Sequence, residues 1–142
     1  SSQKYINDTL IKHISKYKNT NFILILPPYS RIKYAIEAQY NISKFERYKA
    51  NTKYLVKQSE LYSNLKIYGW GNHPFVDNIA NYKDLHHYGH QINSWMLGAI
   101  KRDEGLLTIE NIDSYLEIFT QKSLDYNLLD INNKINIYLN SK

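Results

Sequence analysis

Apolar and polar positions follow a helical period at the start of the chain and then change abruptly. Within residues 4–18, apolar side chains recur at helical spacing and predict an amphipathic helix (Ile6, Leu10, Ile14 and Tyr17). The next apolar run, Phe22–Leu26, is continuous and is followed by Pro27 and Pro28. It predicts a strand covered on both faces, which ends there because proline cannot donate a hydrogen bond to a sheet.

The helical period returns over residues 31–63 and predicts a long helix, with a break near Asn41 or Asn51. The expected inward positions are Ile36, Tyr40, Phe45, Tyr48, Leu55 and Leu61.

The second half of the chain predicts one more strand and three helices. Residues 65–69 alternate in the manner of a strand. A helix is expected to begin close to His87, and another is expected after Thr108 or Asn111, either of which can cap it. Residues 124–139 predict the last helix.

Strands that alternate with helices indicate an α/β protein with parallel strands. A length of 142 residues fits a single domain, residues 1–142. Two strands are too few for a sheet covered on both sides, because sheets usually contain about four to six strands. Either further strands escape the pattern, or the chain is the C-terminal part of a larger unit and ends in extra helices.

The composition narrows the function classes. Hydrophobic residues make up 43% of the chain, as in globular proteins, and no apolar run approaches the roughly 20 residues of a membrane span. The absence of cysteine excludes disulfides, thiol catalysis and thiolate metal sites. The net charge is +5, and the positive charge is concentrated in residues 1–66. An anionic partner such as nucleic acid or an acidic glycan would suit this half. The lysines form no block, however, which favours a solvated helix face instead, and we expect no nucleic-acid partner.

The stretch Asn81–His90 concentrates groups that can transfer protons or bind metals, namely Asp84, His86, His87 and His90. Asp84 and His87 are three residues apart, so one turn brings the carboxylate and the imidazole side by side. The carboxylate can then accept from Nδ1–H, fix the tautomer, and stabilise the imidazolium that forms when His87 removes a proton from a hydroxyl.

Two other interpretations of these histidines remain open. Zinc binding would suit their chemistry, although adjacent residues such as His86 and His87 point in different directions and only His87 and His90 have a chelating spacing. Alternatively, the histidines pack around a loop while Asp84 caps the following helix. We assign no metal and no cofactor.

The string Tyr82-Lys-Asp-Leu-His-His-Tyr88 is followed by Ile92-Asn-Ser-Trp-Met-Leu97. This combination resembles the D-x-x-H-Y pattern in the C-terminal part of envelope-associated members of the SGNH (GDSL-like) hydrolase superfamily. Phe22-Ile-Leu-Ile-Leu-Pro-Pro-Tyr-Ser30 is similar to their strand before P-P-Y-S. The resemblance implies a parallel-stranded, three-layer, flavodoxin-like fold. It also implies that Asp84 orients His87 as general base in ester hydrolysis or acyl transfer on a cell-envelope or capsular carbohydrate.

The chain departs from the superfamily pattern in one respect that matters for catalysis. It has neither the G-D-S block that carries the nucleophile nor the G-x-N-D block that supplies an oxyanion donor. The simplest explanation is that the chain begins after both blocks and is inactive alone. Ser30 is a nucleophile only if the site differs from that of the superfamily, and capping of the helix from Arg31 is its alternative role.

The residues expected to contact substrate are Ser30, Trp70, Asn72, His73 and Tyr88. Of the two tryptophans, Trp70 lies in a glycine-flanked loop and is the better platform for a sugar ring, whereas Trp95 is expected in the core. The expected partners are a carbohydrate or acyl ester, a membrane reached through an upstream segment, and a second chain that completes the sheet. The competing hypothesis is a non-catalytic binding or assembly module that contacts an acidic glycan or a membrane surface.

Overall fold

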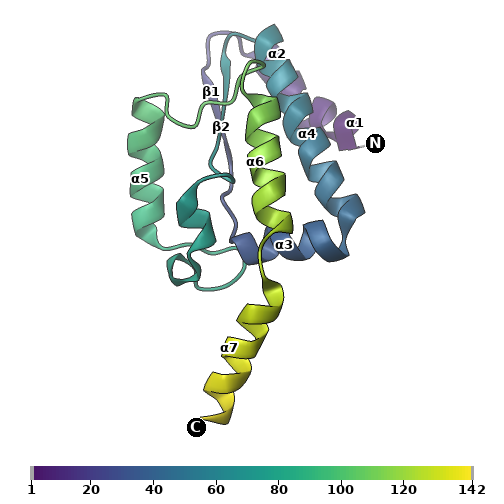
Figure 1. Ribbon diagram of the computed structural model, residues 1–142. Coiled ribbons are helices and arrows are strands. Elements are labelled where there is room, and N and C mark those ends of the chain that lie inside the picture. Colours follow the sequence, from purple (N-terminus) through teal and green to yellow (C-terminus); the bar gives the residue numbers. More distant parts are fainter. Residues whose placement is uncertain (1, 142) are drawn as a thin grey trace.

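The computed structural model describes residues 2–141, which fold into helices arranged around two strands (Figure 1). The N-terminal helical segment consists of α1 (Ser2–Ile6), a π-helical turn (Asn7–Ile11) and α2 (Lys12–Lys16). The strands are β1 (Phe22–Leu26) and β2 (Leu65–Gly69). The other helices are α3 (Arg31–Tyr40), α4 (Ile42–Leu61), α5 (His90–Lys101), α6 (Ile112–Leu124) and α7 (Leu128–Asn140), with short 3₁₀ turns at Pro74–Asp77 (η2) and Ile79–Asn81 (η3).

The strands β1 and β2 pair in parallel, from Phe22 opposite Leu65 to Leu26 opposite Gly69. The chain crosses between them through α3 and α4. This connection is long enough for a parallel pair, which a tight hairpin cannot join. The α/β class with parallel strands and both strand positions are therefore confirmed, while residues 2–141 form a sheet of only two strands.

Helices pack on both sides of the strands, and β2 buries side chains in two directions. In β1, only Leu26 is buried and Ile23 is 53% exposed, which corrects the expectation that this strand is covered on both faces. On one side lie α4 and α6, and on the other lies α5 (Figure 1). Leu65 and Ile67 face the first side, where they join Val56 of α4 and Ile112 of α6. The second side is filled mainly by Tyr68 and Trp70 of the β2 segment with Ile92, Met96 and Ala99 of α5. Within residues 2–141, no helix is long and apolar enough to cross a membrane.

The long helical segment breaks at Asn41, one of the two expected positions. The Asn41 side chain accepts from the amide of Lys44 and so begins α4. The buried residues of α3 include Arg31, Tyr34, Ala35 and Ala38, and those of α4 are Phe45, Thr52, Leu55 and Val56. At about 100° per residue, Ile36 and Tyr40 lie on the opposite side of α3, and Leu61 lies on the opposite side of α4. Ile36, Tyr40 and Leu61 are exposed, which corrects their expected burial, whereas Phe45, Tyr48 and Leu55 point inward.

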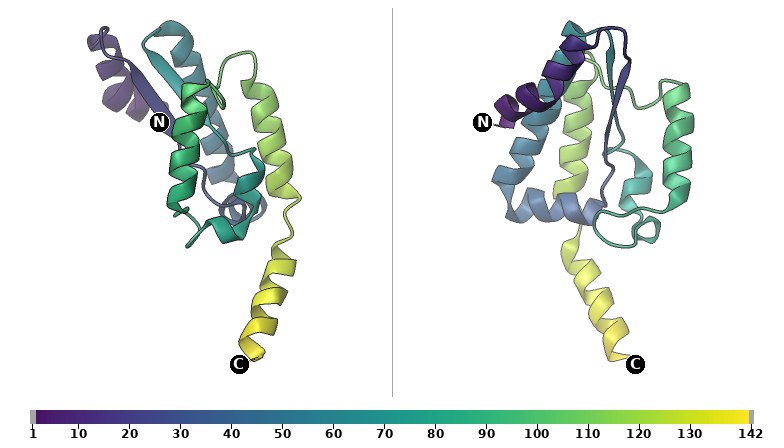
Figure 2. Two further views of the ribbon diagram at one scale, coloured as in Figure 1. Left: turned by 90° about the vertical axis from the view of Figure 1, so that its left-hand side faces the viewer. Right: turned by 180° about the vertical axis from the view of Figure 1, so that it is seen from behind.

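One further boundary differs from expectation. The helix expected near His87 begins at His90, because the preceding residues pair with one another in a loop. Asn111, one of the two expected positions, stands at the start of α6. Its side chain accepts from the amide of Thr108 and makes no capping hydrogen bond to α6. The last helix, α7, projects away from the body of the molecule (Figure 2).

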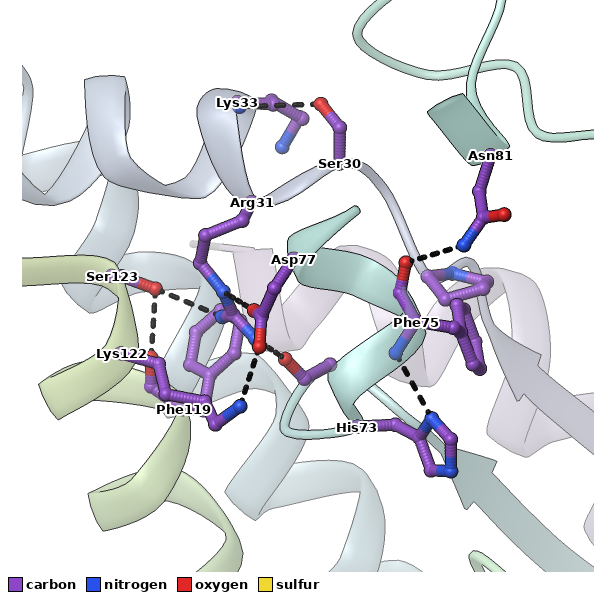
Figure 3. Close-up of polar contacts among 12 residues, drawn as sticks. Ser30, Arg31, Lys33, His73, Phe75, Asp77, Asn81, Phe119, Lys122 and Ser123 are labelled. Carbon is purple, nitrogen blue, oxygen red and sulfur yellow. Dashed lines mark hydrogen bonds and ion pairs between the residues drawn. The ribbon is translucent and has the colours of Figure 1, made fainter. Parts of the chain in front are cut away.

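The side chain of Arg31, at the first position of α3, is only 1% exposed and connects three segments (Figure 3). Its guanidinium donates to Asp77 of η2 (2.8 Å), to the carbonyl of Gly71 after β2 (2.6 Å) and to Ser123 of α6 (3.3 Å). Asp77 also pairs with Lys122 (2.6 Å). A buried guanidinium is tolerated because its donors are satisfied and its charge is paired.

Replacing Arg31 by methionine keeps most of the side-chain volume but leaves the Gly71 carbonyl without its donor. We expect Arg31→Met to lower the free energy of unfolding by about 3 kcal/mol, as when one partner of a buried pair is removed. Urea denaturation measures the change. Arg47→Met is the matched control, because Arg47 is exposed, and its effect should stay within about 0.5 kcal/mol. Equal effects of the two substitutions would contradict the role of Arg31.

Candidate functional site

The residues Asn81–Gly89 form a closed loop in front of α5. The amide of Gly89 donates to the carbonyl of Asn81 (2.9 Å), and the amide of Lys83 donates to the carbonyl of His87 (2.8 Å). Tyr82 and Tyr88 lie opposite each other as an antiparallel bridge at the base of this loop. The loop therefore presents Asp84 and His87 at its tip.

The carboxylate of Asp84 both closes this tip and contacts His87. Its Oδ1 accepts from the backbone amides of His86 (2.8 Å) and His87 (2.9 Å), while Oδ2 lies 2.6 Å from Nδ1 of His87. The amide of His86, followed by the His87 side chain and amide, holds the pKa of Asp84 well below its usual range. Because an ionised carboxylate can only accept, the proton of this contact resides on Nδ1 of His87. Nε2 is then free to accept a proton.

The loop is attached to the segment that follows β1. The hydroxyl and the amide of Ser30 both donate to the carbonyl of Leu85 (3.0 and 3.1 Å), and the hydroxyl of Tyr82 donates to Pro28 (2.8 Å). The Ser30 oxygen also accepts from the amide of Lys33, which confirms its expected capping of α3. Ser30 is 2% exposed, so its hydroxyl positions the loop and is closed to a substrate.

A groove of about 550 Å³ lies beside His87 and is lined by Pro27, Tyr29, His86, His87, Tyr88 and Asn93. It extends from the carboxyl end of β1 to the first turn of α5, and ligands of α/β proteins bind at such carboxyl ends. The His86 ring meets the Tyr29 ring edge-on, with 4.9 Å between centroids. The position of Tyr29 just beyond the strand could be predicted from the sequence. The position of Asn93 on the groove wall could not, because it depends on the direction of α5.

The other three residues expected to contact substrate lie elsewhere. Trp70, Asn72 and His73 line a separate cavity of about 360 Å³, and no residue lines both this cavity and the groove. The candidate residues therefore form two groups: Asp84, His87 and Tyr88 near the groove, with Ser30 behind their loop, and the residues after β2 in the cavity.

The burial of the two tryptophans is the reverse of what was expected. Trp70 is 3% exposed and packs beside Tyr68, because residues two apart along a strand point to the same face. Its buried indole N–H has no acceptor among the described residues, a situation that costs about 1–3 kcal/mol. Trp95, expected in the core, is partly exposed and lies on the cavity wall. Trp70 thus offers no open face for stacking.

His73 is held as a neutral imidazole. Its Nδ1 accepts from the amide of Phe75 (3.2 Å), as drawn in Figure 3, so its proton is on Nε2. Burial lowers the pKa of His73, and the positive charge of Lys122 lowers it further, against an opposing contribution from Asp77.

No family model, curated protein or solved structure matches this chain. Among the described residues, no group of three or more His, Asp or Glu side chains is placed to hold a metal ion.

The contact between Asp84 and His87 predicts which nitrogen carries the proton. In the unsubstituted chain, NMR of ¹⁵N-labelled histidine should show neutral His87 protonated on Nδ1. In Asp84→Asn, the amide should retain its oxygen toward the backbone donors and present N–H to the ring, so the proton should move to Nε2. His13, which lies in α2, serves as the internal control and should keep its spectrum. An unchanged His87 tautomer in Asp84→Asn would contradict this geometry.

Proposed function

We propose that Asp84 and His87 are the orienting carboxylate and the general base of an SGNH-like esterase or O-acyltransferase that acts on a cell-envelope carbohydrate. The observation that carries the proposal is the 2.6 Å contact between Oδ2 and Nδ1, at a loop tip where the His87 side chain is 76% exposed. An orienting carboxylate on one ring nitrogen and an accessible second nitrogen are what such a base requires.

In the proposed reaction, Nε2 of His87 removes the proton of a hydroxyl nucleophile as its oxygen attacks the ester carbonyl carbon. The imidazolium that forms is stabilised by the ionised Asp84. The imidazolium of His87 then gives the proton to the oxygen of the departing alcohol. The carbonyl forms again as the bond between the acyl carbon and that alcohol breaks. Water or a carbohydrate hydroxyl accepts the acyl group in a second step with the same proton movements.

The proposal places the nucleophile outside the described residues. Ser30 is the nearest candidate by sequence, yet its hydroxyl donates to the carbonyl of Leu85 and is buried. No described hydroxyl group donates a hydrogen bond to His87. The catalytic serine would therefore come from another segment or another chain.

The free edge of β1 supports such an addition. The amide of Phe22 donates to the carbonyl of Asn64 on the β2 side (2.7 Å), so the alternation of a parallel ladder turns the backbone groups of Ile23 and Ile25 to the opposite edge. No strand in residues 2–141 takes them. β1 also lacks the charge or proline that protects exposed edges. A further strand here would extend the sheet toward the three-layer fold that the resemblance implies.

The second candidate function is a binding or assembly module without turnover. The exposed lysines of the N-terminal helical segment, Lys12 and Lys16, favour contact with an acidic glycan or a membrane surface. Salt-sensitive binding of such a ligand, with no ester turnover by the complete protein or assembly, would support this candidate instead.

Substitution of His87 tests the catalytic proposal. In the complete protein or assembly, His87→Ala should lower kcat for an acylated carbohydrate by at least about 100-fold, because the step loses its base. His90→Ala is the matched control, since His90 lies outside the groove, and it should keep most of the activity. Near-normal turnover by His87→Ala would overturn the assignment.

Hydrogen exchange tests the addition of a strand. In the chain alone, the amides of Ile23 and Ile25 should exchange much faster than that of Leu24, which the ladder directs toward β2. In the complete protein or assembly, all three should be protected. Fast exchange of Ile23 and Ile25 there would show that this edge of β1 stays free.

A further inference from the structure

The cavity beside β2 has the size of a small-molecule site. It lies between the carboxyl end of β2, the α5 helix and the first half of α6, and its volume is about 360 Å³. Ligand cavities commonly measure roughly 300–1,000 Å³ and combine aromatic walls with a few polar groups. This cavity contains no residue of the Asp84–His87 loop, so it is distinct from the site proposed above.

Three polar side chains on its wall have hydrogen-bonding capacity to spare. The amide of Asn72 and the hydroxyl of Ser114 make no hydrogen bond to any other described residue, although both line the cavity. His73 uses only Nδ1, toward Phe75, and its Nε2–H remains as a donor. Together they offer two groups that both donate and accept and one that donates.

Aromatic rings supply the apolar part of the same wall. Trp70 and Trp95 meet edge to face, with 5.8 Å between ring centroids, and the His73 ring lies 4.7 Å from Trp95. Gly105 packs directly against the Trp70 ring, because a Cβ at this position would lie 2.2 Å from the indole nitrogen of Trp70. This nitrogen is the buried donor that finds no acceptor among the described residues, so its N–H group lacks the hydrogen bond that buried polar groups usually make.

The charges around the cavity favour an uncharged ligand. Among the described residues, Glu104 is the only Asp, Glu, Lys or Arg that lines it. Both of its oxygens are engaged by the guanidinium of Arg102, at 2.8 and 2.9 Å. His73, whose pKa is lowered by burial, is neutral at neutral pH. Neither an anion nor a cation would find an unpaired opposite charge on this wall.

We propose that this cavity binds one neutral pyranose ring of a carbohydrate. The apolar C–H face of such a ring would pack on Trp95, and its hydroxyls would bond to Asn72, His73 and Ser114, which is the combination that sugar rings require. The inference does not depend on ester chemistry at His87. It assigns carbohydrate recognition to a surface separate from the proposed catalytic groove.

The chain carries its own reporter for this site, because its two tryptophans both line the cavity. Titration with methyl glucoside or N-acetylglucosamine should shift or quench the tryptophan emission with a saturable curve. Asn72→Ala and Ser114→Ala should each weaken binding about three- to tenfold, the usual effect of losing one hydrogen bond. Asn133→Ala, on the exposed side of α7, is the matched control and should bind as the parent does.

A bulky substitution separates binding from folding. Ser114 is exposed on α6, so Ser114→Phe should keep the circular dichroism spectrum and melting temperature of the parent while it fills the cavity and abolishes the response. Three results would overturn the proposal: no saturable change with either neutral sugar, an undiminished response in a folded Ser114→Phe, or tighter binding of glucuronate than of methyl glucoside. Loss of ester turnover in His87→Ala has no bearing on these outcomes.

Discussion

The buried guanidinium of Arg31 fixes the relative positions of the segments that carry both sites. It joins the start of α3 to the turn after β2 and to α6, and its ion pair with Asp77 holds η2 between them. A charge so deep in the protein is stable only while these partners keep their geometry. The residue before it, Ser30, binds the loop of Asp84 and His87, so the placement of this dyad depends on the same cluster.

The strands were predictable because their signals are local. The first strand is an uninterrupted apolar run that ends at prolines, and the second is an alternating run that ends at Gly69. The predicted first and last residues of both strands are correct. The start of α5 was not predictable, because it depends on backbone pairing between Tyr82 and Tyr88 that no periodicity reveals. The expected burial of Ile36, Tyr40 and Leu61 failed for a related reason, since packing against other elements, rather than periodicity, decides which side of α3 and of α4 meets the core.

The candidate site also has a part that the sequence could predict and a part that it could not. The contact of Asp84 with His87 follows from a spacing of three residues within one turn, so the sequence could predict it. The surroundings of this pair come from β1 and α5, and the burial of Trp70 against α5 comes from the alternation of β2. A contact between side chains within one turn can be predicted from a short stretch of sequence. The residues that surround such a pair come from distant segments and are known only from the fold.

Enclosure is also what limits the dyad. His87 is largely exposed, and water around an ion pair weakens it, whereas proton transfer gains from a site that excludes water. The groove beside His87 begins at Pro27, directly after the strand whose other edge is unpaired. A strand added to that edge would lie about 5 Å from β1 and end beside the groove. Completion of the sheet and shielding of the dyad would then be consequences of one binding event.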